Sequence, residues 1–279
     1  MIQWRLLVTG PGGGAYNMAL DEALLESAIG GEAPVLRIYS WKPPAVSLGY
    51  FQELDEGIDR AEISRRGFGL VRRPTGGRAI LHKDELTYAV AAREDDIAHG
   101  DSLMGSYRTI SRGIEAGLQM LGVAARLADR SGEGRKQDRQ TLPTVCFGQP
   151  AKVDMLVASR KIVGSAQTRR DGALLQHGSI PVSIDPAEHL AVMPGGLNTN
   201  ERAAGSAETL AELMCGIADI IGRTPSFDEV AQALQAGFVS ALGISFVADE
   251  LAAVESSATA RLITEKYGND AWTAQGGTR

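Results

Sequence analysis

The chain has few of the residues that build disulfide frameworks or metal sites. Its 279 residues include 2 cysteines, Cys146 and Cys215, and 4 histidines, none of them in a metal-ligand spacing such as HxxxH. Two cysteines are too few for a disulfide framework. We therefore expect neither a disulfide scaffold nor a bound metal.

Long apolar runs and an excess of basic charge are also missing. No apolar stretch reaches the roughly 18 residues that a membrane helix needs, and residues 1–7 lack the charged start and long apolar core of a signal peptide. The 28 basic residues are outnumbered by 34 acidic ones, which argues against nucleic-acid binding because phosphate neutralisation supplies most of that affinity. We expect a cytoplasmic protein that binds neither membranes nor nucleic acids.

Apolar residues make up 44% of the chain, enough to form a large core. In the N-terminal half, the glycine-rich run at residues 10–14 lacks the ending of a P-loop and predicts a flexible turn. The next segment predicts a helix capped by Asn17, with Asp21 and Glu22 in its first turn and Gly30 at its end. Further helices are predicted over residues 56–66 and 107–121, and β-rich segments over residues 4–8, 35–40, 46–50, 69–73 and 86–91.

The second half divides into strands followed by helices. Residues 153–184 predict strands, with a hairpin turn at residues 158–160. Ser206 is expected to open a helix whose apolar face continues to Ile221, Ser226 and Glu229 to form a capping box, and a last helix to span residues 249–267. This order predicts an α+β fold, with a catalytic domain over residues 1–204 and a helical C-terminal part over residues 205–279 packed on it.

Several segments carry more polar residues and glycine than the edge of a strand requires. Arg72 and Arg73 adjoin a turn in which Gly76 and Gly77 allow the backbone to approach a ligand closely, while arginine supplies charge. By itself, a Gly-Gly turn between strands is also common as scaffolding. His82 and His177 are candidate pocket residues, but neither adjoins a carboxylate and a nucleophile in a known spacing.

Cys146 follows a polar, charged stretch, residues 129–140, that we expect to form an exposed mobile loop. A lone cysteine is more often a small buried hydrophobe than a nucleophile, and Cys215, on an amphipathic segment, fits that structural role. A nucleophilic cysteine needs a nearby cation or base, because an unperturbed thiol has a pKa of about 8.5. Lys161 is the nearest such candidate in the sequence, although strand lysines are more often simply solvated.

Residues 72–82, Arg-Arg-Pro-Thr-Gly-Gly-Arg-Ala-Ile-Leu-His, resemble the RRxTGGxxxxH signature of the superfamily of lipoate ligases, lipoyl/octanoyl transferases and biotin ligases. Residues 161–167, Lys-Ile-Val-Gly-Ser-Ala-Gln, resemble its second signature, and residues 16–22 and 47–52 also match. The resemblance implies a mixed, largely antiparallel sheet flanked by helices. It also implies that substrate is bound by Arg72, Arg73, Thr75, Gly76, Gly77, His82, Gly164, Ser165 and His177.

The Val-Cys-Phe segment around Cys146 resembles the octanoyltransferases of the LipM type. This resemblance implies that Cys146 carries the acyl group as a thioester and that Lys161 lowers the pKa of its thiol. The implied donor is octanoyl-acyl carrier protein, the acceptor is a lysine of the glycine-cleavage H protein or a lipoyl domain, and no cofactor is needed because passing from a thioester to an amide is downhill.

Two further expectations concern how the substrates bind. The acyl chain is expected to lie in a slot lined by Leu81, Val163 and Ile180, and an acidic carrier to dock against arginines. The candidate docking residues are Arg65, Arg66, Arg72, Arg78, Arg169 and Arg170. Three alternative functions remain: an ATP-dependent lipoate–protein ligase, an octanoyl amidotransferase between lipoyl domains, and a non-catalytic carrier-binding module.

Overall fold

A large mixed sheet organises the protein, for which the computed structural model describes residues 2–129, 153–194 and 206–276. Its eight strands within these residues are β1 (Gln3–Gly12), β2 (Val35–Trp41), β6 (Glu85–Arg93), β7 (Arg126–Asp129), β8 (Val153–Val157), β9 (Arg160–Arg170), β10 (Ala173–Pro181) and β11 (Ser245–Ala248). They lie in the order β11-β1-β2-β6-β10-β9-β8-β7. β1 pairs in parallel with β11 and β2, and all other neighbours are antiparallel, so the predicted largely antiparallel sheet is confirmed.

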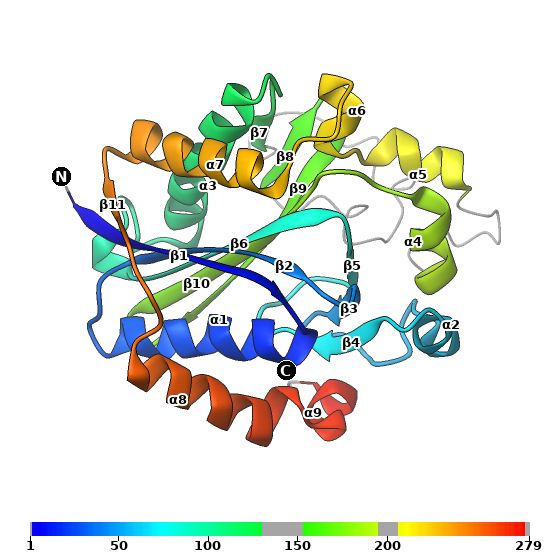
Figure 1. Cartoon of the computed structure of the whole chain (residues 1–279), viewed down its shortest axis with the longest axis horizontal. Helices are drawn as coiled ribbons and strands as arrows, with labels where there is room; N and C mark the ends of the chain where they lie inside the picture. Colours follow the sequence, from blue (N-terminus) through cyan, green and yellow to red (C-terminus); the bar gives the residue numbers. More distant parts are fainter. Residues whose placement is uncertain (1, 130–152, 195–205, 277–279) are drawn as a thin grey trace.

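A smaller sheet and the helices complete the fold (Figure 1). The smaller sheet has the order β4-β3-β5 and consists of β3 (Ala45–Leu48), β4 (Gly69–Arg72) and β5 (Ile80–His82). The helices of the described residues are α1 (Gly14–Ile29), α2 (Arg60–Arg65), α3 (Leu103–Met120), α4 (Pro186–Val192), α5 (Ala207–Leu213), α6 (Ile217–Ile221), α7 (Phe227–Leu242), α8 (Ala253–Leu262) and α9 (Asp270–Gln275). None of the helices in these ranges combines the length and apolarity needed to cross a membrane.

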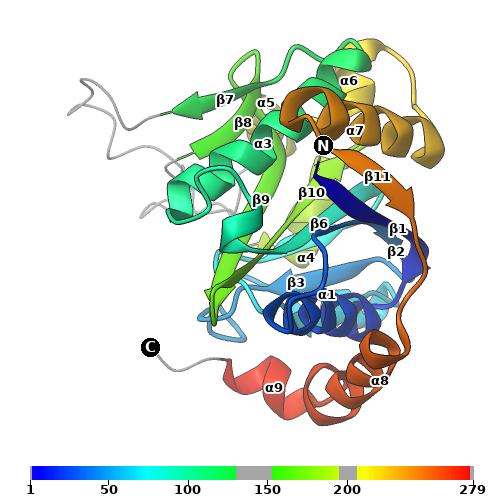
Figure 2. The same ribbon diagram turned by 90° about the vertical axis from the view of Figure 1, so that its left-hand side faces the viewer.

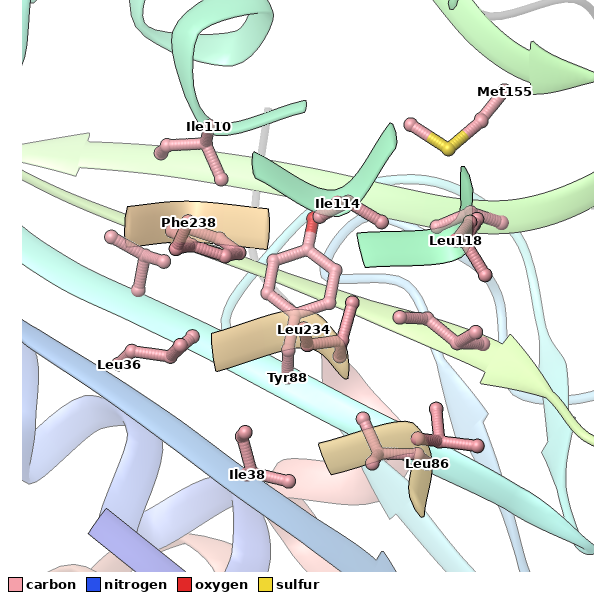
Figure 3. Packing of buried hydrophobic residues seen from close by; sticks show 14 of the residues in the cluster. Leu36, Ile38, Leu86, Tyr88, Ile110, Ile114, Leu118, Met155, Leu234 and Phe238 are labelled. Atoms are coloured by element: carbon pink, nitrogen blue, oxygen red, sulfur yellow. The ribbon is translucent and has the colours of Figure 1, made fainter. Parts of the chain in front are cut away.

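Helices cover both faces of the large sheet. α3 and α7 lie on one face, whereas α1 lies on the other with α8 outside it (Figures 1 and 2). Side chains of β6 alternate between the two: Leu86 and Tyr88 pack with Ile114 and Phe238 of α3 and α7 (Figure 3), and Ala89 faces α1. Helices therefore bury the strands on both faces of the sheet, and the predicted α+β architecture is confirmed.

The contact between α3 and α7 depends on glycine. A Cβ atom on Gly237 would lie 2.2 Å from the backbone nitrogen of Gly117 and 2.5 Å from the carbonyl oxygen of Gly113.

We expect Gly237→Ala to lower the free energy of unfolding by about 2 kcal/mol, because the overpacking outweighs alanine's better helix propensity. Urea denaturation measures the change. Ser240→Ala, at an exposed position of the same helix, should change it by less than about 0.5 kcal/mol, and equal stabilities for all three proteins would contradict this prediction.

The first helix begins three residues before the predicted cap. Gly13 is the N-cap of α1, and the backbone N–H of Asn17 already donates to the Gly13 carbonyl at 2.9 Å. The prediction that Asn17 caps the helix, with Asp21 and Glu22 in the first turn, is therefore wrong. The amide of Asn17 instead donates to the carbonyl oxygens of Gly12 and Ser40, and both acidic side chains are buried.

The glycine run ahead of this helix is not the predicted turn. Gly10 and Gly12 continue β1 beyond an irregularity after Val8 and pair with Tyr39 and Trp41 of β2. Gly10 has φ = +64°, a conformation that glycine adopts without strain. The glycines therefore let the strand bend and extend toward α1.

The other N-terminal predictions agree with the structure apart from their bounds. Strands cover the β-rich segments, and α3 confirms the helix through residues 107–121. The helix predicted over residues 56–66 is shorter, because Asp59 caps α2 by accepting a hydrogen bond from the backbone of Glu62 at 2.9 Å. The short strand β5 was not predicted.

The C-terminal third is less regular than predicted. The hairpin is confirmed, with Ala158 and Ser159 at positive φ between β8 and β9. Ser206 caps α5 as predicted, but the chain is extended through Met214 and Cys215 and resumes as the separate helix α6. Ser226 caps α7 through the backbone N–H of Glu229. β11 and α9 were missed, and the predicted domain boundary after residue 204 lies outside the described residues.

Candidate active site

A cavity of about 220 Å³ lies between the two sheets and the start of α1. It is lined by strands β2, β6, β9 and β10 of the large sheet, and by β3, β5 and the segment between β4 and β5. The predicted site residues that line it are Arg73, Gly77, His82, Lys161, Gly164, Ser165 and His177. The structure thus brings together most of the two signature segments, which are far apart in the chain.

One row of residues across four neighbouring strands lines the cavity. Thr87 of β6 lies opposite Tyr39 of β2 on one side and Ser179 of β10 on the other. Ser179 in turn lies opposite Gly164 of β9. Because side chains alternate along a strand, these four residues share one face of the sheet. All four line the cavity.

Lys161 reaches the cavity because of an irregularity in strand pairing. Met155 pairs with Val163, but Leu156 pairs with Lys161, which leaves one extra residue in β9. Such a bulge redirects the side chains that follow it. Lys161 therefore lines the same cavity as Gly164, and its ammonium forms an ion pair with Asp154 at 2.9 Å.

The backbone of Lys161 is held as well as its side chain. Its carbonyl oxygen accepts a hydrogen bond at 3.0 Å from the backbone N–H of Cys215, and Lys161 forms an isolated parallel bridge with Met214. Cys215 is completely buried, and burial raises the pKa of its thiol to about 11. The structural role predicted for Cys215 agrees with this position.

The turn between β4 and β5 is organised around Arg73. The Arg73 guanidinium donates to the carbonyl oxygens of Gly76 and Arg78 at 2.8 and 2.7 Å. Gly77 has φ = +96°, and a Cβ on Gly49 would lie only 1.8 Å from the Gly77 carbonyl oxygen. Glycine is therefore required both at the turn and at the backbone that packs against it.

Arg72 points away from the cavity. It is fully buried, and its guanidinium donates to the carbonyl oxygens of Gly49 and Gln52 at 2.6 Å and of Thr273 at 2.8 Å. These bonds tie β4 to α9 and to the segment after β3. The expectation that Arg72 docks a carrier protein is wrong, because a buried guanidinium cannot contact one.

His177 belongs to a buried polar chain that starts on α1. Its Nδ1 lies 2.8 Å from Asp21, and its Nε2 lies 2.7 Å from the Thr75 hydroxyl. Burial alone would raise the pKa of Asp21, but Arg37 at 2.6 Å, His177 and the Tyr39 hydroxyl together lower it. Burial, with the nearby charge of Arg73 and with His82, lowers the pKa of His177 even though Asp21 acts to raise it. The pair is therefore an ionised carboxylate beside a neutral imidazole.

Asp21 should make stability depend on pH. A carboxyl group with a lowered folded-state pKa stabilises the fold above its unfolded pKa, near 3.9, and loses this effect as the pH falls through the folded value. We expect Asp21→Asn to cost about 3 kcal/mol at pH 7, because Arg37 loses a buried partner, and to cost less on acidification below pH 4. Urea denaturation at several pH values tests this.

The exposed Asp171 provides the control, because Asp171→Asn should change stability by less than about 0.5 kcal/mol. A loss for Asp21→Asn that stayed constant from pH 7 to pH 3 would contradict the electrostatic explanation.

His82 lies in a second chain of the same kind. Its Nδ1 is 2.7 Å from Glu85 and its Nε2 is 2.8 Å from Ser47, a diagonal neighbour across β3 and β5. Glu85 also accepts a hydrogen bond from Ser179. The His82 ring stacks on Trp41 with centroids 4.0 Å apart. Both predicted histidines are thus held by a carboxylate on one nitrogen and a hydroxyl on the other.

Some predicted residues lie elsewhere. Cys146 and most of the stretch 129–140 fall outside the described residues. Leu81, Val163 and Ile180, predicted to line the acyl slot, belong to hydrophobic clusters and do not line this cavity, whereas the neighbouring Ile80 does. The remaining docking arginines form ion pairs with carboxylates: Arg65 and Arg66 with Glu62, Arg78 with Glu56, Arg169 with Glu94, and Arg170 with Glu22.

Four polar residues of the site were missed from the sequence: Asp21, Ser47, Glu85 and Asp154. Asp21 and Ser47 lie inside the matching segments 16–22 and 47–52, so those segments carried a usable signal. Asp154 lies two residues before Leu156, the partner of Lys161 in the hairpin, and the bulge in that pairing decides which side chains meet. Within the described ranges, no group of three or more His, Cys, Asp or Glu residues is placed to hold a metal ion.

Sequence comparison identifies close relatives over nearly the whole chain. The chain is 41% identical to octanoyltransferase LipM of Kyrpidia tusciae over 273 residues, covering 98% of both. It is 42% identical to octanoyltransferase LipM of Symbiobacterium thermophilum over 275 residues, covering 96% of this chain and 97% of the relative.

Solved structures of lipoate protein ligases resemble this chain as well. A lipoate-protein ligase A bound with ATP superposes with a TM-score of 0.78 at 29% identity, covering 98% of both chains. The bi-partite lipoate protein ligase of Thermoplasma acidophilum, studied with its E2 lipoyl domain, gives a TM-score of 0.80 at 28% identity, covering 100% of this chain and 99% of the other. The sequence profile of the lipoyl protein ligase A/B catalytic domain matches residues 14–239. The chain therefore belongs to the lipoyl protein ligase A/B catalytic domain family, as the two signatures predicted.

Proposed function

We propose that this chain passes an octanoyl group from octanoyl-acyl carrier protein, through a thioester on Cys146, to a lysine of a lipoyl domain or the glycine-cleavage H protein. The observation that carries the activity is the identity of 41% and 42% with octanoyltransferases along nearly the entire length. The chain is accordingly an octanoyltransferase of protein lipoylation. The route through Cys146 and the identities of donor and acceptor are the proposal.

The reaction has two steps that balance without a nucleotide. The Cys146 thiolate attacks the thioester carbonyl, a new carbon–sulfur bond forms, and the carrier leaves as a thiolate that takes up a proton. The lysine ε-amine then attacks the enzyme thioester, an amide forms and the Cys146 thiol is regenerated. The first step exchanges one thioester for another, and the second is downhill.

The cavity suits the thioester end and the start of the acyl chain. Lys161 and the β4–β5 turn bring positive charge and backbone amides to one part of it, which would stabilise a developing oxyanion. Met18, Trp41 and Ile80 supply apolar surface for methylene groups. Arg78 is the predicted docking arginine that lines the cavity. It also forms an ion pair with the exposed Glu56 at 2.8 Å.

A structural relative supports the proposed acceptor. One structural relative was studied with its E2 lipoyl domain, which supports a lipoyl domain as the carrier of the acceptor lysine. A lipoyl domain is therefore the first acceptor to test, with the glycine-cleavage H protein as the second.

Intact mass spectrometry tests the proposal. Incubation with octanoyl-acyl carrier protein should add one octanoyl group to the chain, and peptide mapping should place it on Cys146. Adding a lipoyl domain without ATP should then move the group to a lysine. The proposal fails if no acylated enzyme forms or if the group is found on another residue.

The same assay separates the alternatives. A structural relative was solved with ATP, so an ATP-dependent ligase is the principal rival. It would act on free octanoate or lipoate only when ATP is present. An amidotransferase would take the octanoyl group from a lipoyl domain rather than from the carrier, and a carrier-binding module would bind the carrier without transferring anything.

A further inference from the structure

Three features of the structure fix the position of Lys161: a bulge in its strand, a backbone hydrogen bond and an ion pair. A bulge turns its side chain into the cavity, and the Cys215 N–H fixes its carbonyl oxygen at 3.0 Å. Asp154 completes the arrangement with an ion pair at 2.9 Å. Lys161 is only 6% exposed and Asp154 only 8%.

Burial of this pair has an electrostatic consequence. A lysine removed from water tends to lose its proton, and a carboxylate within hydrogen-bond distance opposes that tendency. Other groups lining the cavity work against the charge or leave it unchanged: Arg73 and Arg78 are cationic, and His177 is neutral. Asp154, at 2.9 Å, carries a charge whose sign favours an ammonium.

We propose that Asp154 is a positioning residue of the octanoyltransferase: it keeps Lys161 charged and aimed into the cavity. This inference deepens the proposed function and rests on it for its kinetic consequence, but its electrostatic core concerns only Asp154 and Lys161. The segment Met214–Cys215 supports the same arrangement by fixing the backbone of Lys161. The pair as a whole is neutral, which lets a lysine stay protonated in a cavity partly lined by apolar side chains.

A titration of Lys161 tests this without any transfer reaction. The chain contains six lysines, so protein labelled with ¹³C-lysine gives few Cε signals, and the Lys161 signal is assigned by its absence in Lys161→Arg. In the unsubstituted protein we expect that signal to keep the chemical shift of an ammonium through pH 8, because the Asp154 carboxylate lies 2.9 Å from the Lys161 nitrogen. In Asp154→Asn the signal should already show the neutral amine at pH 8 and the ammonium again as the pH falls toward 6.5, because burial persists without the carboxylate.

The rate of octanoyl transfer should follow the same titration. We expect Asp154→Asn to be about 100-fold slower at pH 8 and to recover part of this loss toward pH 6.5, where Lys161 regains its proton. Lys161→Ala should show no such recovery. Because His82 and His177 also line the cavity, the comparison uses the ratio of variant to unsubstituted rate at each pH.

Two further variants keep the test decisive. Asp154→Glu, which retains the charge, should keep the high titration of Lys161 even if the altered geometry slows transfer. Asp101→Asn, at an exposed position, should change neither measurement. If Asp154→Asn does not fold, Asp154→Glu and the unsubstituted protein still carry the titration.

The outcomes distinguish this inference from the proposed function. Titration of Lys161 below pH 8 in the unsubstituted protein, or an unchanged titration in Asp154→Asn, would overturn the role of Asp154. Failure of the unsubstituted protein to form an acyl-enzyme would instead overturn the proposed function and leave the titration result standing.

Discussion

Cys146→Ser is expected to abolish octanoyl transfer, lowering the rate by more than about 10³-fold. A serine hydroxyl ionises far less readily than a thiol near neutral pH, so the variant lacks the nucleophile on which the proposed route depends. Release of free acyl carrier protein in a single turnover measures the first step directly. Mass spectrometry of the same sample shows whether any acyl-enzyme has formed.

Cys215 provides an internal control for the reactivity of Cys146. Cys215 is buried, and burial raises the pKa of its thiol to about 11. Iodoacetamide at neutral pH should therefore label Cys146 and leave Cys215 unmodified. The mechanism would have to be abandoned if Cys146→Ser retained transfer, or if octanoyl were found on Cys215.

Lys161→Ala is the second change with a large expected effect. An ammonium within about 4–6 Å of a thiol lowers the pKa of that thiol by one unit or more, so its loss should raise the pH at which iodoacetamide reacts with Cys146. The substitution also removes the partner of the buried Asp154 carboxylate at 2.9 Å, so the negative charge of Asp154 is no longer compensated. We expect transfer to slow by about 100-fold.

A double substitution separates these two effects. Lys161→Ala combined with Asp154→Asn removes both charges, so alkylation of Cys146 should begin at a pH between those of the unsubstituted protein and Lys161→Ala. Lys161→Arg keeps a charge and should retain part of the activity. If all four proteins share one alkylation profile, Lys161 does not tune the thiol, and binding of the acyl carbonyl becomes its role.

Local sequence patterns predicted helices and turns correctly where the residues of the element itself determine its structure. The apolar spacing of residues 107–121 predicted α3, and the Ala158–Ser159 turn predicted the hairpin between β8 and β9. These patterns failed where a contact with another element determines the structure. The apolar face from Leu210 to Ile221 suited one helix, but the backbone of Cys215 donates to Lys161 instead and interrupts it.

The candidate active site likewise has features that the sequence predicted and features that it did not. The two signatures predicted which segments bind substrate, and the cavity contains Arg73, Gly77, His82, Lys161 and His177 from them and their surroundings. Arg72 belongs to the same signature as Arg73 but faces the opposite way, because successive residues at the end of a strand point to opposite sides. A sequence motif therefore identified the segment but not the direction of each side chain.

By itself, the sequence determined the family, the α+β class and the segments that carry the chemistry, because these depend on residue types and short-range periodicity. Only the tertiary structure decided which carboxylate accompanies each functional group: Asp21 with His177, Glu85 with His82, and Asp154 with Lys161. Asp21 is 156 residues from its histidine and meets it only when α1 packs on the sheet. Asp154 is close in sequence, but a bulge in strand pairing determines that Lys161 turns toward the cavity. Such pairings depend on register and packing between elements, which the pattern within one element does not specify.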